Sequence, residues 1–117
     1  MKQERLIGII TFGNPGKKIQ VVRPDDIVCV EARTDHVNIK VRSRDGTKEE
    51  TYTIHKSLKT VQETLDLIQI HRGWLINLYH LKAIDDEMAI LNNGTQIPIG
   101  KSYKEELMKL LSIIGKG

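Results

Sequence analysis

The chain has 117 residues, 39% of them hydrophobic and 28% charged, with a formal net charge of +3. This length suits one domain, whose aliphatic side chains can form a core without disulfides or metals. No stretch approaches the roughly 20 apolar residues of a membrane helix, and no leader-like segment opens the chain. Cys29 is the single cysteine, which excludes an internal disulfide. We therefore expect a cytoplasmic protein of one domain that does not contact membranes.

The charge and the aromatic content limit the kinds of nucleic-acid binding that this chain can perform. The 18 Lys and Arg residues barely outnumber the 15 Asp and Glu residues and form no strongly basic block. Nucleic-acid binding would therefore need a basic patch that folding assembles. Five aromatic residues are too few for a platform on which single-stranded bases stack. The composition thus argues against a single-strand binder.

Short β patterns fill the first half of the chain. Turn residues, among them Asn14-Pro15-Gly16, separate runs in which apolar residues are continuous or alternate with polar ones. In Val37–Arg42 the alternation leaves one basic face, as in a half-buried strand. The predicted strands are Leu6–Thr11, Lys18–Val22, Ile27–Val30, Val37–Arg42 and Glu50–Ile54.

The second half mixes helical and β patterns. Leucine and valine at helical spacing, with Ser57 as N-cap, predict a helix over about Leu58–Leu67. Ser102 and Glu105 have capping-box spacing and predict a helix over Ser102–Ile114. Asn93-Gly94 is a strong hairpin signal, and Pro98 favours an edge strand. Strands are predicted at Lys82–Ile84, Met88–Leu91 and Ile97–Ile99. The result is a mainly β, antiparallel protein with about two short helices.

No catalytic or cofactor signature is present. The chain lacks a phosphate-binding glycine loop and a nucleophile elbow, so we expect neither an enzyme nor a bound cofactor. The four histidines have no metal-ligand spacing, and no metal site is predicted. Cys29 lies in an apolar run, which favours packing over reactivity.

The most informative segment reads IHRGWLIN, residues 70–77. A histidine, an arginine and a glycine interrupt two apolar runs here. In one interpretation, Arg72 is a surface ion-pair partner and Gly73 is a plain turn residue. The other is a loop tip at Arg72-Gly73, anchored by Trp74 and Leu75, that presents a guanidinium to a groove.

Four segments, in order, resemble the LytTR-type DNA-binding domain of bacterial transcription regulators. They are PDDIVCVEA (24–32), IHKSLKTVQETL (54–65), IHRGWLINLYHLKAI (70–84) and MAILNNGTQIPIGKSYKEEL (88–107). The resemblance extends over about residues 5–114, which we take as one domain. No receiver domain, which often precedes this module, is present in the sequence. The chain is either a stand-alone member or a piece of a longer response regulator.

The resemblance implies a fold, a partner and a set of contacts. The fold is an elongated assembly of small antiparallel sheets. The partner is double-stranded DNA with repeated half-sites, whose successive grooves receive loops, and pairing of two copies occurs on DNA or through the missing receiver domain. The main contacts fall on His36, Arg72 and Lys101. Asn38, Lys40, His55 and Lys56 are candidate phosphate contacts, because they lie near these loops or on exposed strand positions, and solvated surface is at least as strong an alternative for each of the four. Gly73, next to Arg72, completes the set of DNA-binding candidates.

Three departures from the family pattern affect this expectation. Gly73 and Gly100 stand where serine is common, which removes two hydroxyl groups. Lys101 stands where arginine is usual, which removes the fork geometry of a guanidinium. A protein-interaction module that antagonises another regulator is therefore the alternative function. Acidic residues such as Asp35 at the binding edge would favour that alternative.

Overall fold

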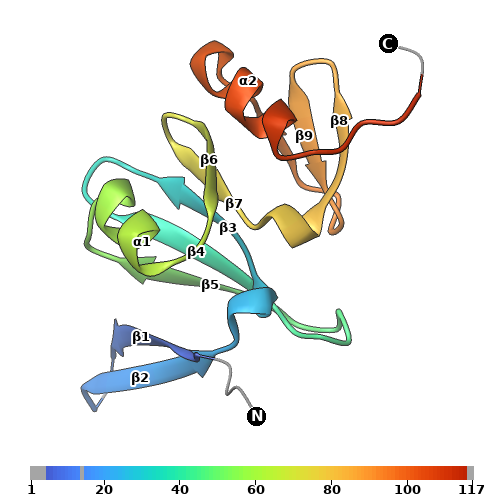
Figure 1. Ribbon diagram of the computed structural model, residues 1–117. Coiled ribbons are helices and arrows are strands. Elements are labelled where there is room, and N and C mark those ends of the chain that lie inside the picture. The colour runs from blue at the N-terminus through green and yellow to red at the C-terminus, as the bar shows by residue number, and fades with distance from the viewer. Residues whose placement is uncertain (1–4, 14, 116–117) are drawn as a thin grey trace.

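The computed structural model describes residues 5–13 and 15–115, so Asn14 of the predicted first turn lies outside the described residues. Within them the protein is mainly β, with ten strands, two α-helices and two 3-10 helices (Figure 1). The elements are β1 (Ile7–Phe12), β2 (Lys17–Val22), β3 (Ile27–Ala32), β4 (Val37–Arg42), β5 (Glu49–Ile54), α1 (Leu58–Thr64), β6 (Ile68–His71), β7 (Trp74–Ile76), β8 (Leu81–Asp85), β9 (Met88–Leu91), β10 (Gln96–Pro98) and α2 (Lys101–Lys109), with 3-10 helices at Pro24–Asp26 and Leu78–His80.

Every strand pair among these residues is antiparallel. The strands form a two-stranded sheet β1-β2, a three-stranded sheet β10-β9-β8 and a five-stranded sheet β5-β4-β3-β7-β6. The predicted fold class is therefore confirmed. Pro98 lies in β10, an edge strand, as its missing N–H group requires.

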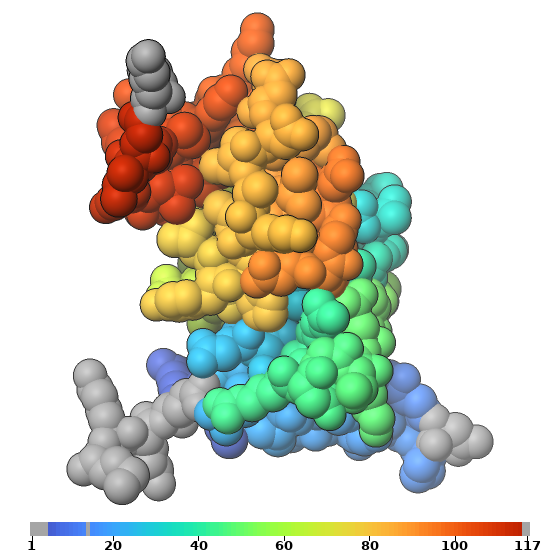
Figure 2. Space-filling model, turned by 90° about the vertical axis from the view of Figure 1, so that its right-hand side faces the viewer, coloured from blue at the N-terminus to red at the C-terminus, as the bar shows by residue number. Residues whose placement is uncertain are grey.

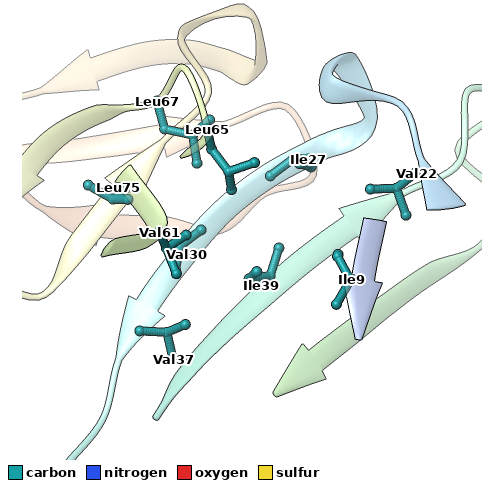
Figure 3. Packing of buried hydrophobic residues seen from close by; sticks show 10 residues of the cluster. All are labelled: Ile9, Val22, Ile27, Val30, Val37, Ile39, Val61, Leu65, Leu67 and Leu75. Atoms are coloured by element: carbon teal, nitrogen blue, oxygen red, sulfur yellow. The ribbon is translucent and has the colours of Figure 1, made fainter. Parts of the chain in front are cut away.

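β3 is the central strand of the five-stranded sheet, and both of its faces are covered. Its first four residues, Ile27–Val30, are all buried, which explains their uninterrupted apolar sequence. One face packs with α1 and β1 in a cluster drawn in Figure 3: Ile9, Val22, Ile27, Val30, Val37, Ile39, Val61, Leu65, Leu67 and Leu75. The covered sheet thus holds the loops at its ends on a rigid base.

The opposite face packs against the three-stranded sheet and α2. Buried residues of all three units form this second cluster: Val28, Cys29, Ile70, Ile76, Ala89, Leu91, Ile97, Ile99 and Leu107. Asn93 in the β9–β10 turn also donates from Nδ2 to Glu49 Oε2 of β5 over 3.0 Å. Figure 2 shows this turn, in orange, against the green β4–β5 hairpin. Packing between the two sheets and this hydrogen bond therefore join the three-stranded sheet to the five-stranded sheet.

The molecule is elongated, as the family resemblance implied. Its extents are 56 × 38 × 27 Å and its radius of gyration is 15.1 Å. A compact domain of this length has a radius of gyration of about 13.4 Å. The β1-β2 ribbon forms one end, and α2 with the three-stranded sheet forms the other (Figure 1).

The ribbon is apolar on both faces. Ile9 and Val22 on the inner face are buried in the first cluster. The outer face exposes Ile10 (45%), Ile19 (58%) and Val21 (60%), and Phe12 is 81% exposed. The alternation that normally marks the solvated side of a strand is therefore missing here.

Helix α1 begins as predicted but is shorter. Ser57 Oγ accepts the N–H of Thr60 over 3.1 Å, which confirms the cap. The helix ends at Thr64 instead of Leu67, because Leu65 adopts an extended conformation (φ −102°, ψ 138°). Leu65 and Leu67 are nevertheless buried. Burial of the two leucines in the chain leading to β6 replaces the predicted last helical turn.

Helix α2 differs from its prediction at both ends. It begins at Lys101 with Gly100 as N-cap and no side-chain capping bond, so the predicted capping box at Ser102 and Glu105 is wrong. It ends at Lys109, before Ile114, which is 96% exposed. Leu107 is fully buried, whereas Leu110, just after the helix, is 49% exposed. No helix in the described residues is long and apolar enough to cross a membrane.

Candidate nucleic-acid interface

Three turns distant in sequence meet at one end of the five-stranded sheet. The β3–β4 turn (33–36) and the β6–β7 turn (72–73) are adjacent because Ala32 N–H donates to Gly73 O over 2.8 Å. The turn before α2 (99–100) lies beside the β6–β7 turn, because Gly100 N–H donates to Ile70 O over 2.8 Å. In Figure 1 the β3–β4 and β6–β7 turns lie on the same side of the molecule. We call this set of three turns the loop edge.

Arg72 occupies the tip of the β6–β7 turn and is exposed. His71 holds the turn closed, since its Nδ1 accepts the N–H of Gly73 over 3.1 Å. Trp74 is half-buried and Leu75 is fully buried at the base. The predicted loop tip with an anchored base is confirmed. The interpretation of Arg72 as an ion-pair partner is wrong, because Arg72 has no ion pair among the described residues.

Lys101 is the first residue of α2 and is exposed. It has no ion pair within residues 5–13 and 15–115. Its neighbour Gly100 lies close to His71, since a Cβ built on Gly100 would be 3.6 Å from His71 Cα. Lys101 therefore follows directly on the residue that contacts the Arg72 turn. The two predicted cations lie on adjacent turns.

His36 closes the β3–β4 turn. Its carbonyl oxygen accepts the N–H of Arg33 over 2.8 Å, and its Nδ1 lies 2.7 Å from Asp35 Oδ1. That hydrogen bond from His36 lowers the pKa of the Asp35 carboxyl, which is therefore an anion at neutral pH. The sequence pattern indicated Asp35 only as a possible acid at the binding edge. It did not indicate Arg33, an exposed cation in the same turn that pairs with Glu31 over 3.3 Å. Proximity to His36 is the signal that marks both residues.

His55 and Lys56 follow β5 and are exposed. Because Val37 pairs with Ile54, His55 comes to lie beside His36, with ring centroids 5.8 Å apart and planes inclined by 62°. His55 thus joins the loop edge, although 19 positions separate it from His36 in the chain. The sequence offered no sign of this contact.

Asn38 and Lys40 lie further along β4 and are engaged with neighbours. Asn38 Oδ1 accepts a hydrogen bond from the Thr53 hydroxyl over 2.8 Å. Lys40 Nζ is 3.6 Å from Glu49 Oε1, and Glu49 is the residue that Asn93 contacts. These two residues therefore differ from Arg72 and Lys101, which have no ion pair in the described part of the chain.

The two glycines that replace the family's serines have different surroundings. A Cβ on Gly73 would meet His71 Nδ1 at 3.7 Å, an ordinary contact, whereas on Gly100 it would approach Tyr103 Cδ2 to 3.0 Å. Gly73 could therefore become serine without rearrangement. At Gly100 the tyrosine ring would have to move.

Asn77, the last residue of the IHRGWLIN segment, is buried and structural. Its Nδ2 donates to the carbonyl oxygens of Ile27 and Pro24 over 3.0 and 3.3 Å. Its Oδ1 accepts the N–H of Tyr79 over 3.1 Å. No sequence pattern indicated a role for Asn77, which connects the chain after β7 to the start of β3 through these hydrogen bonds.

One group of side chains in the described residues could hold a metal ion. Asp35, His36 and His55 each offer a ligand atom, and these atoms lie within 4.8 Å of one another. Sequence spacing predicted no such group, because the residues come from separate turns. Cys29 is buried in β3 and is not part of this group, and burial raises the pKa of its thiol to about 11.

Comparisons with known proteins place this architecture in a family. Residues 17–112 match the model of the LytTr DNA-binding domain. The sequence is 30% identical to the sensory transduction protein LytT of Bacillus subtilis over 84% of this chain and 42% of that protein. It is 29% identical to the transcriptional regulatory protein BtsR of Escherichia coli over 82% of this chain and 40% of that protein. The chain belongs to the LytTR family of DNA-binding domains.

A solved structure supports the fold. A LytTr DNA-binding domain from Bacillus cereus superposes with a TM-score of 0.71, at 23% identity, over 91% of this chain and 97% of that one. This chain spans about two fifths of the length of the curated relatives that it matches. The family is one of DNA-binding domains.

Proposed function

We propose that this protein binds double-stranded DNA sequence-specifically in the cytoplasm and so regulates transcription, with the loop edge as its contact surface. One observation supports this most directly: Arg72 and Lys101, 29 positions apart, are exposed on adjacent turns without acidic partners in the described residues. Unpaired cations on a rigid edge suit a polyanion with grooves. Membership of the LytTR family supports the same partner.

The three main residues have different chemistry toward DNA. The guanidinium of Arg72 can donate two parallel hydrogen bonds to N7 and O6 of guanine in the major groove. Lys101 presents a point charge, which suits a phosphate. His36 can donate to a base edge or to a phosphate. We assign base readout to Arg72, charge to Lys101 and an adjoining contact to His36, with Gly73, His55 and Lys56 flanking them.

The finer features of recognition belong to the same proposal, and the family and the elongated shape support them. Loops, rather than a recognition helix, enter successive grooves, and two copies occupy repeated half-sites. Residues 5–114 form the DNA-binding domain, and pairing occurs on DNA or through a receiver domain of a longer two-component response regulator. Relatives named for sensory transduction and transcriptional regulation support this context.

Selection of bound sites from random duplexes, followed by a footprint, tests the class of function. Recovery of repeated half-sites is the expected result. A titration of wild type, Arg72→Ala and Lys101→Ala with salt, on selected and scrambled duplexes, then tests the residues. Lys82→Ala is the matched control, because Lys82 is an exposed lysine of β8 outside the loop edge.

The two variants should behave differently. Arg72→Ala should cost about 1–3 kcal/mol on the selected site and relax the preference at one base pair. Lys101→Ala should weaken both duplexes alike and lower the slope of log affinity against log salt by about one unit. Equal weakening of both duplexes by Arg72→Ala would instead make Arg72 a phosphate contact.

Asp35 favours the second candidate, a protein-interaction module that antagonises another regulator. Its carboxylate side chain is 74% exposed at the loop edge and contacts His36. Duplex DNA would be repelled there, whereas a basic protein surface would be attracted. If no duplex is selected and neither Arg72→Ala nor Lys101→Ala alters binding to any DNA, this function replaces the first.

A further inference from the structure

Asp35, His36 and His55 form a compact group of potential metal ligands at the loop edge. Asp35 and His36 lie in the β3–β4 turn. This turn is closed by a hydrogen bond of 2.8 Å from Arg33 N–H to His36 O. The pairing of Val37 with Ile54 brings His55 to the same place. The turn's backbone hydrogen bond and the strand register therefore fix the backbone positions from which the three side chains extend.

We propose that Asp35, His36 and His55 bind one divalent transition-metal ion of the Zn²⁺ type, and that this ion strengthens the binding of duplex DNA at the loop edge. The second half of the proposal rests on the proposed function, whereas the first half stands on the geometry of the three side chains.

The ligand chemistry selects the kind of ion. Two imidazole nitrogens and one carboxylate oxygen suit Zn²⁺, whereas Ca²⁺ and Mg²⁺ prefer oxygen ligands throughout. Tetrahedral Zn²⁺ with bonds of about 2.0–2.2 Å places its ligand atoms about 3.3–3.6 Å apart. The three ligand atoms here lie within 4.8 Å of one another, so no pair of them has to close by more than about 1.5 Å. Rotation about side-chain torsions of exposed residues supplies such a movement.

The site also leaves room for another ligand. Three protein ligands complete only part of a tetrahedral shell, so one position is open to water or to a phosphate oxygen. Asp35 and His55 are exposed and His36 is half-buried, so solvent and an incoming strand can reach this position.

Charge explains why the ion would favour DNA. Without metal, the Asp35 carboxylate faces solvent beside the turn that carries Arg72, and it repels a phosphate backbone. A bound dication converts this local charge from about −1 to about +1 when the two imidazoles are neutral. The ion therefore adds to the attraction of Arg72 and Lys101 and offsets the one acid in the β3–β4 turn.

Zn²⁺ binding to the full chain without DNA tests the site. Calorimetry should give one ion per chain, and Zn²⁺ should shift the NMR signals of two of the four histidines. His55→Gln should abolish both effects. His80→Gln is the matched control, because His80 Nε2 contacts the Asp25 carbonyl at 2.6 Å, a contact at the opposite end of β3 that glutamine can replace. Equal zinc binding by wild type and His55→Gln would overturn the site.

Duplex affinity in Zn²⁺ and in chelator tests the effect on DNA. Wild type should bind its selected duplex at least about fivefold more tightly with Zn²⁺, and by linkage the duplex should raise zinc affinity by the same factor. His55→Gln should show no response to zinc. Asp35→Asn should bind DNA more tightly than wild type in chelator, because it removes the repelling charge, and should respond less to zinc.

The two halves fail in different ways. Zinc binding that requires His55 but leaves duplex affinity unchanged or lower would overturn the effect on DNA and preserve the site. Failure of the chain to bind any duplex, with zinc binding intact, would overturn the proposed function and with it the second half of the proposal.

Discussion

At the scale of single residues, hydrogen bonding sets the protonation of Asp45 in the β4–β5 hairpin. Its Oδ1 accepts from the hydroxyls of Ser43 and Thr47, each over 2.7 Å, and from the N–H of Thr47 over 3.0 Å. These bonds stabilise the carboxylate and lower the pKa of Asp45 from 3.8 to about 2. One exposed side chain thus organises the whole turn.

We expect the hairpin to lose this support in acid. Because the pKa of Asp45 is lower in the folded state, its contribution is complete above about pH 4 and disappears as pH falls through about 2. An NMR titration of the Asp45 carboxyl carbon should give a midpoint near 2, and Ser43→Ala should raise it. A midpoint close to 3.8 in the wild type would contradict the hydrogen bonds of the turn.

Cys29 should be chemically inert in the folded protein. It is 2% exposed, and burial raises the pKa of its thiol to about 11, so little reactive thiolate forms near neutral pH. Iodoacetamide at pH 8 should modify the native chain far more slowly than the same chain in denaturant. Equal rates would show that β3 opens readily or is not the central strand.

At the scale of elements, one buried side chain, Leu107, anchors α2. Leu107 is fully buried in the second cluster, whereas Leu110, one turn later, is 49% exposed. This helix carries Lys101 at its first position, so its packing also places a proposed DNA contact.

Truncation of these two leucines should separate their roles. Leu107→Ala should lower the free energy of unfolding by about 2–5 kcal/mol, because it leaves a cavity in a packed core. Leu110→Ala should change it by less than about 1 kcal/mol. Denaturant unfolding measures both. Similar losses for the two variants would mean that α2 is rotated relative to the described packing.

At the scale of the whole molecule, we consider whether the β1-β2 ribbon unfolds together with the other two sheets. Ile9 and Ile10 are neighbours on β1, and they face opposite ways: Ile9 is 1% exposed and lies in the first cluster, and Ile10 is 45% exposed. They therefore form a matched pair for the inner and outer faces of the ribbon.

We expect one cooperative unit that includes the ribbon. Ile9→Ala should then cost about 2–5 kcal/mol in global unfolding and Ile10→Ala less than about 1 kcal/mol. Thermal unfolding monitored by circular dichroism and by hydrogen exchange of the ribbon amides checks this. If Ile9→Ala accelerates exchange only in the ribbon and leaves the global transition unchanged, the ribbon opens independently.

Local patterns were sufficient for much of the fold. The strand alternation of Val37–Arg42, the Ser57 cap and the Asn93-Gly94 hairpin each involve neighbours in the chain, and the structure confirms all three. Turn chemistry and side-chain periodicity act over a few residues, so the sequence can report them directly. The same holds for the Arg72-Gly73 tip, because its anchors adjoin it.

The ends of the two helices depended on residues that are distant in the sequence. The pattern around Leu65 and Leu67 is compatible with a helix, but both side chains reach the core from an extended segment. Ser102 has capping-box spacing, but Gly100, which is held to Ile70, is the N-cap, and the helix begins at Lys101. Tertiary packing overrides weak local preference at such positions.

The sequence by itself determined the class of fold, the family and the exposed Arg72 turn, because each rests on order and spacing along the chain. Only the tertiary structure decided which cations remain unpaired: Lys40 meets Glu49, while Arg72 and Lys101 meet no acid in the described residues. It also brought His36 and His55 together. Strand register, which sums many backbone hydrogen bonds, sets these contacts, and no local pattern encodes them.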